Sequence, residues 1–238
     1  MRIEPTGDTK TVICKVAMGR THFAQLRREG RIYDEHLKGL QGTVVPHVYG
    51  FFAGRGFDGK TGVLVMEECG VPLRMHYSHY PLGFKKSLVD GLVALHRTAR
   101  VVHGDFDRSH VVVRRLPDGK LHATIISFGK AGINHKCRFK GEIVPDARGP
   151  EPTEDRVPCP ELWEVVYLSE IYTPATVEYF GEDVPVEWAK DPQTLLQMGG
   201  RPKGCSEVQA RAHAETVCAE YKDWLELRAE CDEESFEL

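Results

Sequence analysis

The chain has 238 residues, of which 41% are hydrophobic and 28% are charged, and its formal net charge is −4. This length is enough for one large domain or for two lobes around a cleft. Because there is no basic excess and no long unbroken apolar run, the composition argues against nucleic-acid binding and against a membrane-spanning helix. The seven cysteines are scattered, and residues 1–5 lack the apolar core of a signal peptide, so we expect reduced thiols and an intracellular, cytoplasmic or nuclear location.

The beginning of the chain predicts a strand and then a helix. Residues 10–17 are rich in β-branched side chains that alternate, which is typical of a strand, and Lys15 lies in its middle. Residues 21–40 change to a helical period, with Glu29 among the charged positions. The predicted apolar face of this helix consists of Phe23, Leu26, Ile32, Tyr33 and Leu37.

The next stretch predicts two hairpins with a helix between them. Residues 42–53 suit a short loop and then a strand, and residues 63–66 suit a buried strand. Together they predict an antiparallel hairpin around a turn, residues 54–62, that is rich in Gly and Asp. Residues 67–73 then break the sheet, as a linker between lobes would. Residues 84–98 predict a helix, and residues 111–126 predict a second hairpin, because Asp-Gly at its centre is a strong turn signal.

The last part of the chain is less regular. Residues 131–158 are rich in Gly, Pro and charge, which indicates a long exposed loop. Helices are predicted over 160–172 and 206–230, while Pro and Gly interrupt residues 173–205. The acidic tail from residue 230 onward is expected to fray. The predicted buried side of the final helix consists of Val208, Ala212, Val217, Trp224 and Leu225.

The stretch from Val101 to Val113 carries the clearest functional pattern. An apolar approach ends in His103-Gly104-Asp105, and five residues after the Asp comes His110, followed by an apolar run. This is the layout of a phosphotransferase catalytic loop, in which the Asp accepts a proton from the attacking hydroxyl. In such a loop a polar residue five positions after the Asp holds a metal ion.

Taken in order, the motifs over residues 11–163 resemble the protein kinase fold from the third strand of its small lobe onward. The resemblance implies an α+β, bilobal fold with a truncated, antiparallel-sheet small lobe (residues 1–68) and a mainly helical large lobe (residues 69–238). Few residues precede the predicted strand of Lys15, which starts at residue 10, so we expect the first strands and the glycine-rich loop to be missing. Segments such as Glu67-Glu68-Cys69-Gly70 are also similar to a group of fungal protein-kinase-like domains.

The resemblance also implies a set of site residues. Asp105 would be the catalytic base, Lys15 would hold the α- and β-phosphates of ATP, and Glu29 would pair with that lysine. The nucleotide-binding positions that the resemblance implies are Lys15, Glu29, Met66, Glu67, Cys69, His110 and Ser127. Without the resemblance, Lys15 is best interpreted as a solvent-facing strand lysine and Glu29 as a solvated helix charge. The two could also form a plain ion pair, and Asp105 could be a structural residue of its loop.

Two positions depart from the kinase pattern at the metal site. Ser127 stands where the family has the Asp of Asp-Phe-Gly, and His110 stands where it has Asn. A neutral hydroxyl is a poor ligand for Mg²⁺, and imidazole suits zinc or copper better, so we do not expect magnesium at these positions. Asp107, two residues after Asp105, is a candidate replacement ligand for a metal ion.

We therefore predict a catalytically impaired, pseudokinase-like domain that binds ATP weakly and acts through protein partners. The alternative is an active ATP-dependent phosphotransferase with Asp105 as base. It would be a protein Ser/Thr kinase or, because His-Gly-Asp is similar to the loop of aminoglycoside and choline phosphotransferases, a small-molecule kinase.

A His-x-Cys pair, His135 and Cys137, is followed at a distance by Cys159. These residue types are suitable zinc ligands. No fourth ligand is evident, and the spacing is not that of a zinc finger. We therefore favour the interpretation that these residues pack in the fold or are ordinary thiols, and metal binding is the alternative.

Overall fold

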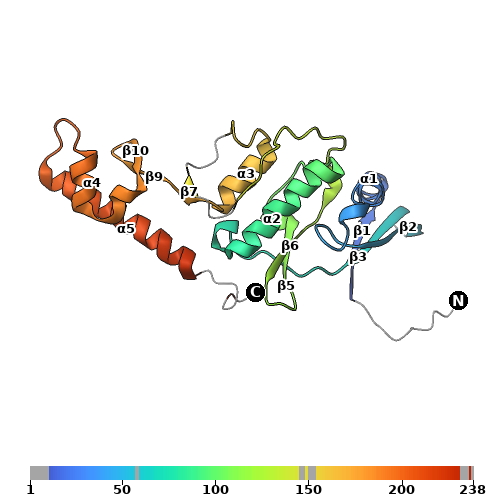
Figure 1. Cartoon of the computed structure of the whole chain (residues 1–238). Helices are drawn as coiled ribbons and strands as arrows, with labels where there is room; N and C mark the ends of the chain where they lie inside the picture. The colour runs from blue at the N-terminus through green and yellow to red at the C-terminus, as the bar shows by residue number, and fades with distance from the viewer. Residues whose placement is uncertain (1–10, 57–58, 145–147, 150–153, 231–235, 237–238) are drawn as a thin grey trace. The chain divides into compact units, whose positions relative to one another are not determined.

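The computed structural model shows helices and strands together, with small antiparallel sheets and five α-helices among the described residues (Figure 1). The described residues are 11–56, 59–144, 148–149, 154–230 and 236. Two compact units are present: unit 1 comprises residues 1–74, 87–140 and 238, and unit 2 comprises residues 75–86 and 141–237. The mixed α and β content agrees with the predicted class, while the division into lobes at residue 68 stays a prediction.

Unit 1 begins with an antiparallel sheet in the order β1-β3-β2, formed by β1 (Val12–Met18), β2 (Val48–Gly56) and β3 (Gly59–Glu67). Residue 10, where the first strand was predicted to start, lies outside the described residues. The predicted hairpin is present, but β2 ends three residues later than predicted, and β3 is longer than the predicted 63–66. Arg55 faces Lys60 across the ladder, in a stretch whose Gly content indicated a turn. Cross-strand pairing here overrides the local turn preference of glycine.

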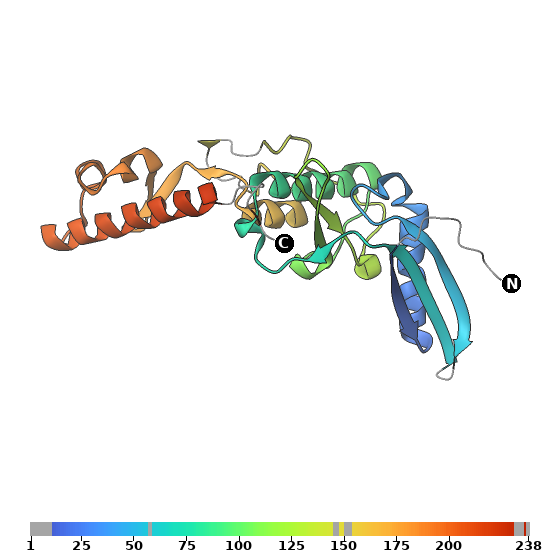
Figure 2. The ribbon, with the colours of Figure 1, turned by 90° about the horizontal axis from the view of Figure 1, so that it is seen from below.

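Helix α1 (Arg20–Glu35) packs along this sheet (Figure 2). All five residues of its predicted apolar face are buried, although the helix ends at Glu35 and a 3₁₀ turn, η1 (Lys38–Leu40), follows. Gly30 faces the sheet, and a Cβ there would lie 3.4 Å from atoms of Leu64 and Phe51. A glycine at this position therefore lets the helix and the sheet approach closely.

The rest of unit 1 holds a second antiparallel sheet and residues 87–94 of a helix that ends in an unusual turn. The sheet has the order β4-β5-β6, with β4 (Val71–Pro72), β5 (Val111–Arg115) and β6 (Leu121–Ile125), so the predicted second hairpin is confirmed. Helix α2 (Leu82–Ala94) continues into a π-helical turn, η3 (Leu95–Ala99). Two short 3₁₀ turns, η4 (Arg108–His110) and η5 (Phe128–Lys130), follow β4 in the chain and carry candidate site residues.

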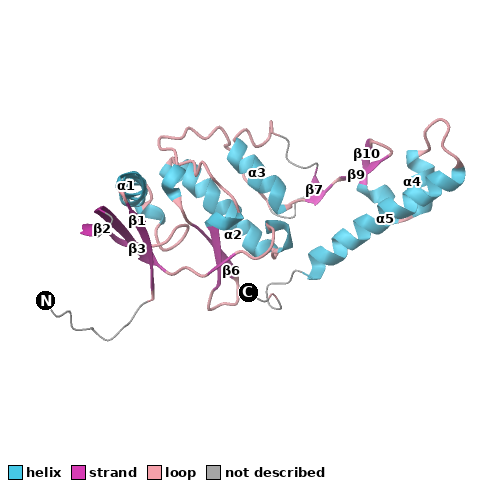
Figure 3. Cartoon of the chain, turned by 180° about the vertical axis from the view of Figure 1, so that it is seen from behind, coloured by secondary structure: helices cyan, strands magenta, loops and turns pink. Residues whose placement is uncertain are grey.

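Unit 2 is built from short elements and one long helix (Figure 3). Helices over 160–172 and 206–230 were predicted, and α3 and α5 occupy most of these ranges. In chain order the elements are η2 (Tyr77–His79), β7 (Arg148–Gly149), α3 (Pro160–Ser169), β8 (Thr173–Pro174), β9 (Thr176–Tyr179), β10 (Glu182–Pro185), η6 (Val186–Lys190), α4 (Pro192–Gly199) and α5 (Glu207–Glu230).

The segment from residue 173 to 205, predicted to be irregular, is more ordered than its Pro and Gly content indicated. It contains the β9-β10 hairpin and helix α4. Pro192 occupies the first turn of α4, where a missing N–H costs nothing, and the Asp191 carboxylate accepts from the Thr194 N–H at 2.8 Å. The proline therefore begins the helix instead of breaking it.

The predicted buried side of α5 is largely wrong. Val208 is 79% exposed, and Ala212 and Leu225 are exposed as well. Only Val217 is a buried member of the predicted set; it shares a core with Tyr179, Val184, Leu195 and Ala214. The helix packs through small alanines, a signal that a search for large apolar side chains does not find. No helix in the described part of the chain is both long and apolar enough to cross a membrane.

Candidate functional site

Lys15 of β1 and Glu29 of α1 form an ion pair. The Lys15 Nζ lies 2.8 Å from Glu29 Oε2 and 3.0 Å from Oε1, so it donates to both carboxylate oxygens. The Glu29 side chain is 3% exposed and that of Lys15 is 42% exposed. A buried carboxylate needs a charged or hydrogen-bonding partner, so the contact with Lys15 stabilises the buried carboxylate of Glu29. The structure thus contains the ion pair, while its role toward a nucleotide stays a prediction.

An open pocket of about 620 Å³ lies beside this pair, lined by residues of β1, α1 and the η5 turn. Lys15 and Glu29 are on its wall together with Lys130, and the apolar side chains of Val16 and Leu26 contribute another part. The pocket wall therefore carries two amines and one carboxylate next to an apolar surface.

Three of the predicted nucleotide-binding positions, Met66, Glu67 and Cys69, do not line this pocket. Met66 and Cys69 are buried, and the Glu67 carboxylate accepts from Arg114 at 3.4 Å. Burial raises the pKa of the Cys69 thiol to about 11, with the nearby charge of Glu67 as the second cause. At neutral pH this thiol stays protonated and is a packing group with low reactivity.

Asp105 is paired with a lysine that the sequence patterns did not indicate. Its Oδ2 lies 2.9 Å from the Nζ of Lys130, and its side chain is 38% exposed. The hydrogen bond from Lys130 and the charge of that lysine lower the pKa of the Asp105 carboxyl below its usual value. Asp105 is therefore ionised at neutral pH but is a weaker base than a free carboxylate.

Gly104, the middle residue of the His-Gly-Asp motif, has a structural reason to be glycine. Its φ is +77°, and a Cβ built there would lie only 2.8 Å from the carbonyl oxygen of Lys130. A side chain would meet both the left-handed backbone and this carbonyl. The glycine thus lets the backbone of the Asp105 loop pass close to the backbone that carries Lys130.

The two other polar residues of the Asp105 loop are engaged in holding its shape. The Nδ1 of His110 lies 2.6 Å from the backbone carbonyl oxygen of Asp105, which makes Nδ1 the donor. Asp107 accepts from the backbone N–H of Ser109 at 2.5 Å and begins the η4 turn. Hydrogen bonds from Ser109 lower the pKa of the Asp107 carboxyl. Asp107, considered above as a replacement metal ligand, therefore acts as a turn cap.

Ser127 has a left-handed backbone, with φ 72° and ψ 60°, and begins the η5 turn. Asp and Asn tolerate this conformation better than most residues, so an acidic residue would fit the backbone here. The Ser127 side chain makes no capping hydrogen bond to the turn.

The next residue, Phe128, is fully buried and packs edge-on against the rings of Tyr33 and His103, with centroid distances of 5.2 and 4.9 Å. Arg28 of α1 donates to the carbonyl oxygens of Gly129 at 2.8 Å and of Ala131 at 2.6 Å. Helix α1 thus holds the Phe-Gly turn by packing and by hydrogen bonds.

A second constellation of polar side chains lies elsewhere in unit 1. One ligand-type atom from each of His96, His135 and Cys137 lies within 4.8 Å of the others. His96, on the π-helical turn, was not predicted, because nothing in the local sequence links it to a His-x-Cys pair so far along the chain. Cys159, the third residue of the predicted set, belongs to unit 2.

Comparison of the chain with protein-family models gives no match, and comparison with curated proteins gives none. The interpretation of both constellations therefore depends on their own residues and geometry.

Proposed function

We propose that unit 1 holds a protein-kinase-like nucleotide site that binds ATP without requiring a metal ion, that phosphate transfer from it is impaired, and that the chain acts through protein partners. The observation that carries the proposal is the Lys15–Glu29 ion pair on the wall of the 620 Å³ pocket. In protein kinases a strand lysine that pairs with a helix glutamate holds the phosphates of ATP.

Phosphate binding is supported by the charges around the pocket. Lys15 and Lys130 both line it, and the side chain of Lys130 is 70% exposed. Glu29 contacts the amine of Lys15, and Asp105 contacts that of Lys130, so each amine is positioned by a carboxylate. Two positioned amines can neutralise part of the charge of a triphosphate in place of a metal ion.

The residues at the two metal-binding positions that the kinase resemblance implies support impaired transfer. Ser127 offers no carboxylate for a metal ion, and the Nδ1 of His110 is already directed at the Asp105 carbonyl. The loss of one electrostatic stabiliser of a transition state costs roughly 10²–10³ in rate, and here both metal positions are replaced. Asp105 is also weakened as a base by Lys130.

Calorimetric titration of ATP into the purified chain, once with Mg²⁺ and once with EDTA, tests the proposal. We expect similar affinity in both buffers and a decrease of at least about tenfold in Lys15→Met, because a positioned amine is lost from the phosphate contacts. Lys120→Met is the matched control: Lys120 is also paired, with Asp118 at 3.3 Å, but it lies in the exposed β5-β6 turn. Absence of ATP binding, or equal affinity in Lys15→Met and wild type, would contradict the proposal.

The second candidate is an active ATP-dependent phosphotransferase, and the ionised, partly exposed carboxylate of Asp105 favours it. Transfer of labelled phosphate from ATP, to water or to the protein itself, distinguishes the two. We expect no transfer by the wild type and Mg²⁺-dependent transfer by the double variant Ser127→Asp/His110→Asn. Asp105→Asn in that background should abolish it. Transfer by the wild type that Asp105→Asn removes would establish the second candidate instead.

A further inference from the structure

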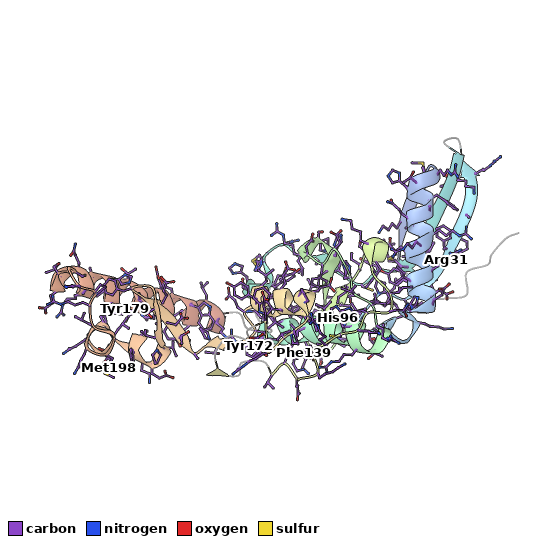
Figure 4. All side chains as sticks on the ribbon, turned by 90° about the horizontal axis from the view of Figure 1, so that it is seen from above. Arg31, His96, Phe139, Tyr172, Tyr179 and Met198 are labelled. Carbon is purple, nitrogen blue, oxygen red and sulfur yellow. The ribbon has the colours of Figure 1, made fainter. Side chains whose placement is uncertain are left out.

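We propose that His96, His135 and Cys137 bind one zinc ion that joins the π-helical turn before the Asp105 loop to the segment after the Phe-Gly turn. The proposal is independent of the nucleotide site, since none of the three residues lines the pocket of Lys15 and Glu29. Figure 4 marks His96, together with Phe139 of the segment that carries the other two ligands.

The three ligand atoms are already gathered. All lie within 4.8 Å of one another, and the rings of His96 and His135 have centroids 4.7 Å apart at an interplanar angle of 69°. In a tetrahedral zinc site with bonds of about 2.0–2.3 Å, ligand atoms are roughly 3.3–3.8 Å apart. A contraction of about 1 Å, within the reach of side-chain rotation, would complete the geometry.

The backbone on both sides of the cluster is held in place. The N–H of His135 donates to the carbonyl of Arg100 at 2.7 Å, and residues Val102 and Gly132 exchange two hydrogen bonds of 2.9 and 2.8 Å. Arg97 donates to the carbonyl oxygen of Phe139 through Nε at 3.3 Å and through a terminal nitrogen at 3.2 Å. Ligands on segments that are tied to each other lose little freedom on binding a metal, which favours affinity.

The guanidinium of Arg97 also lies 4.9 Å from the centre of the Phe139 ring. This contact adds to the hydrogen bonds that fix the segment after Cys137. His96 itself is on a π-helical turn, which widens the helix locally; such turns occur frequently at functional sites.

The ligand types select the metal. Two imidazoles and one thiolate suit a borderline-soft ion such as Zn²⁺, whereas Mg²⁺ and Ca²⁺ require oxygen ligands. His96 is 1% exposed and Cys137 is 7% exposed, while His135 is partly exposed and leaves an approach for the ion. Three protein ligands leave the fourth tetrahedral position to water or to another side chain.

Metal binding to the 238-residue chain gives the direct test. After removal of metal with a chelator and dialysis, we expect about one equivalent of Zn²⁺ to bind. Saturation with Zn²⁺ should raise the unfolding midpoint by on the order of 5–10 °C. Co²⁺ in place of Zn²⁺ should give a thiolate-to-metal charge-transfer band together with the visible bands of a tetrahedral ion.

Two ligand variants and two matched controls make the test specific. His135→Ala and Cys137→Ser should each weaken Zn²⁺ binding at least about 100-fold, and Cys137→Ser should also abolish the charge-transfer band. His47→Ala and Cys14→Ser remove an exposed imidazole and an exposed thiol from other parts of unit 1 and should leave both signals unchanged. The proposal is wrong if the wild type binds far less than one equivalent, or if the controls and the ligand variants behave alike.

Discussion

At the scale of single residues, the Asp105 loop is held by backbone contacts more than by side-chain chemistry. His110 donates to the carbonyl of Asp105, Asp107 caps a turn, and Gly104 leaves room for the carbonyl of Lys130. The group that determines the electrostatic state of Asp105 is Lys130, which follows directly after Phe128-Gly129. This amine keeps the Asp105 carboxylate ionised and lowers its basicity.

The pH dependence of Asp105 is the prediction at this scale. A carboxyl whose pKa is lower in the folded than in the unfolded chain stabilises the fold above its ordinary pKa of 3.8, and that contribution is lost as the pH falls through the lower, folded value. Lys130→Ala should therefore raise the pKa of Asp105, as followed by carboxyl ¹³C NMR. Lys120→Ala, which removes the partner of Asp118, serves as control. An Asp105 pKa that is the same in wild type and Lys130→Ala would show that the two residues are not paired in solution.

At the scale of elements, β1 and α1 act together to place one buried charge. Gly19, with φ 79°, makes the short connection between them, and its N–H donates to the carbonyl of Lys60 on the neighbouring strand β3. This connection allows Lys15 and Glu29 to meet although they are only 14 residues apart. Arg28, beside Glu29 in α1, at the same time reaches the Phe-Gly turn.

A double-mutant cycle on Lys15 and Glu29 tests this arrangement. Lys15→Met should cost about 1–3 kcal/mol in the free energy of unfolding, because it leaves the Glu29 carboxylate buried without its partner while Lys15 itself is partly exposed and screened. Lys15→Met/Glu29→Leu should cost less than the sum of the single changes, since the unpaired charge is removed.

Urea unfolding of the four proteins measures the coupling energy. The exposed pair Lys222 and Glu226, 3.4 Å apart on α5, provides a control cycle with an expected coupling of about 0.5 kcal/mol or less. Strictly additive effects of the Lys15 and Glu29 substitutions would show that the ion pair does not stabilise unit 1.

At the scale of the whole molecule, the candidate nucleotide residues belong to one compact unit. Unit 1 contains every position that the kinase resemblance implied, namely Lys15, Glu29, Met66, Glu67, Cys69, Asp105, His110 and Ser127. Unit 2 has a core of its own around Tyr179, Val184 and Leu195. We therefore expect the two cores to respond separately to substitution.

Leu195→Ala tests this separation. Leu195 is fully buried in unit 2, so its truncation should cost about 2–5 kcal/mol in the stability of the segment from β9 to α5. Affinity for ATP should stay within about twofold of the wild type. Hydrogen exchange followed by mass spectrometry locates the loss of stability, and calorimetry measures ATP binding. Met198→Ala, on the same helix but 56% exposed, is the control for a change in α4. A decrease of ATP affinity in Leu195→Ala alone would mean that the site depends on unit 2.

The sequence by itself determined the features that depend on local periodicity and turn chemistry. The buried face of α1, the β5-β6 hairpin and the existence of α2, α3 and α5 follow from the spacing of apolar residues and from an Asp-Gly turn. The order of Lys15, Glu29 and the Asp105 loop along the chain was also enough to nominate a candidate nucleotide site.

Only the tertiary structure decided which residues meet across long stretches of chain. Two such contacts join segments whose local sequence patterns do not predict them. Lys130 lies beside Asp105, and His96 lies beside His135 and Cys137. The burial of Ala214 on α5 could not be predicted from the sequence for a related reason. Small side chains are buried only where a particular neighbour approaches closely. Local sequence specifies the elements, whereas the packing of distant segments selects the partners that give a site its chemistry.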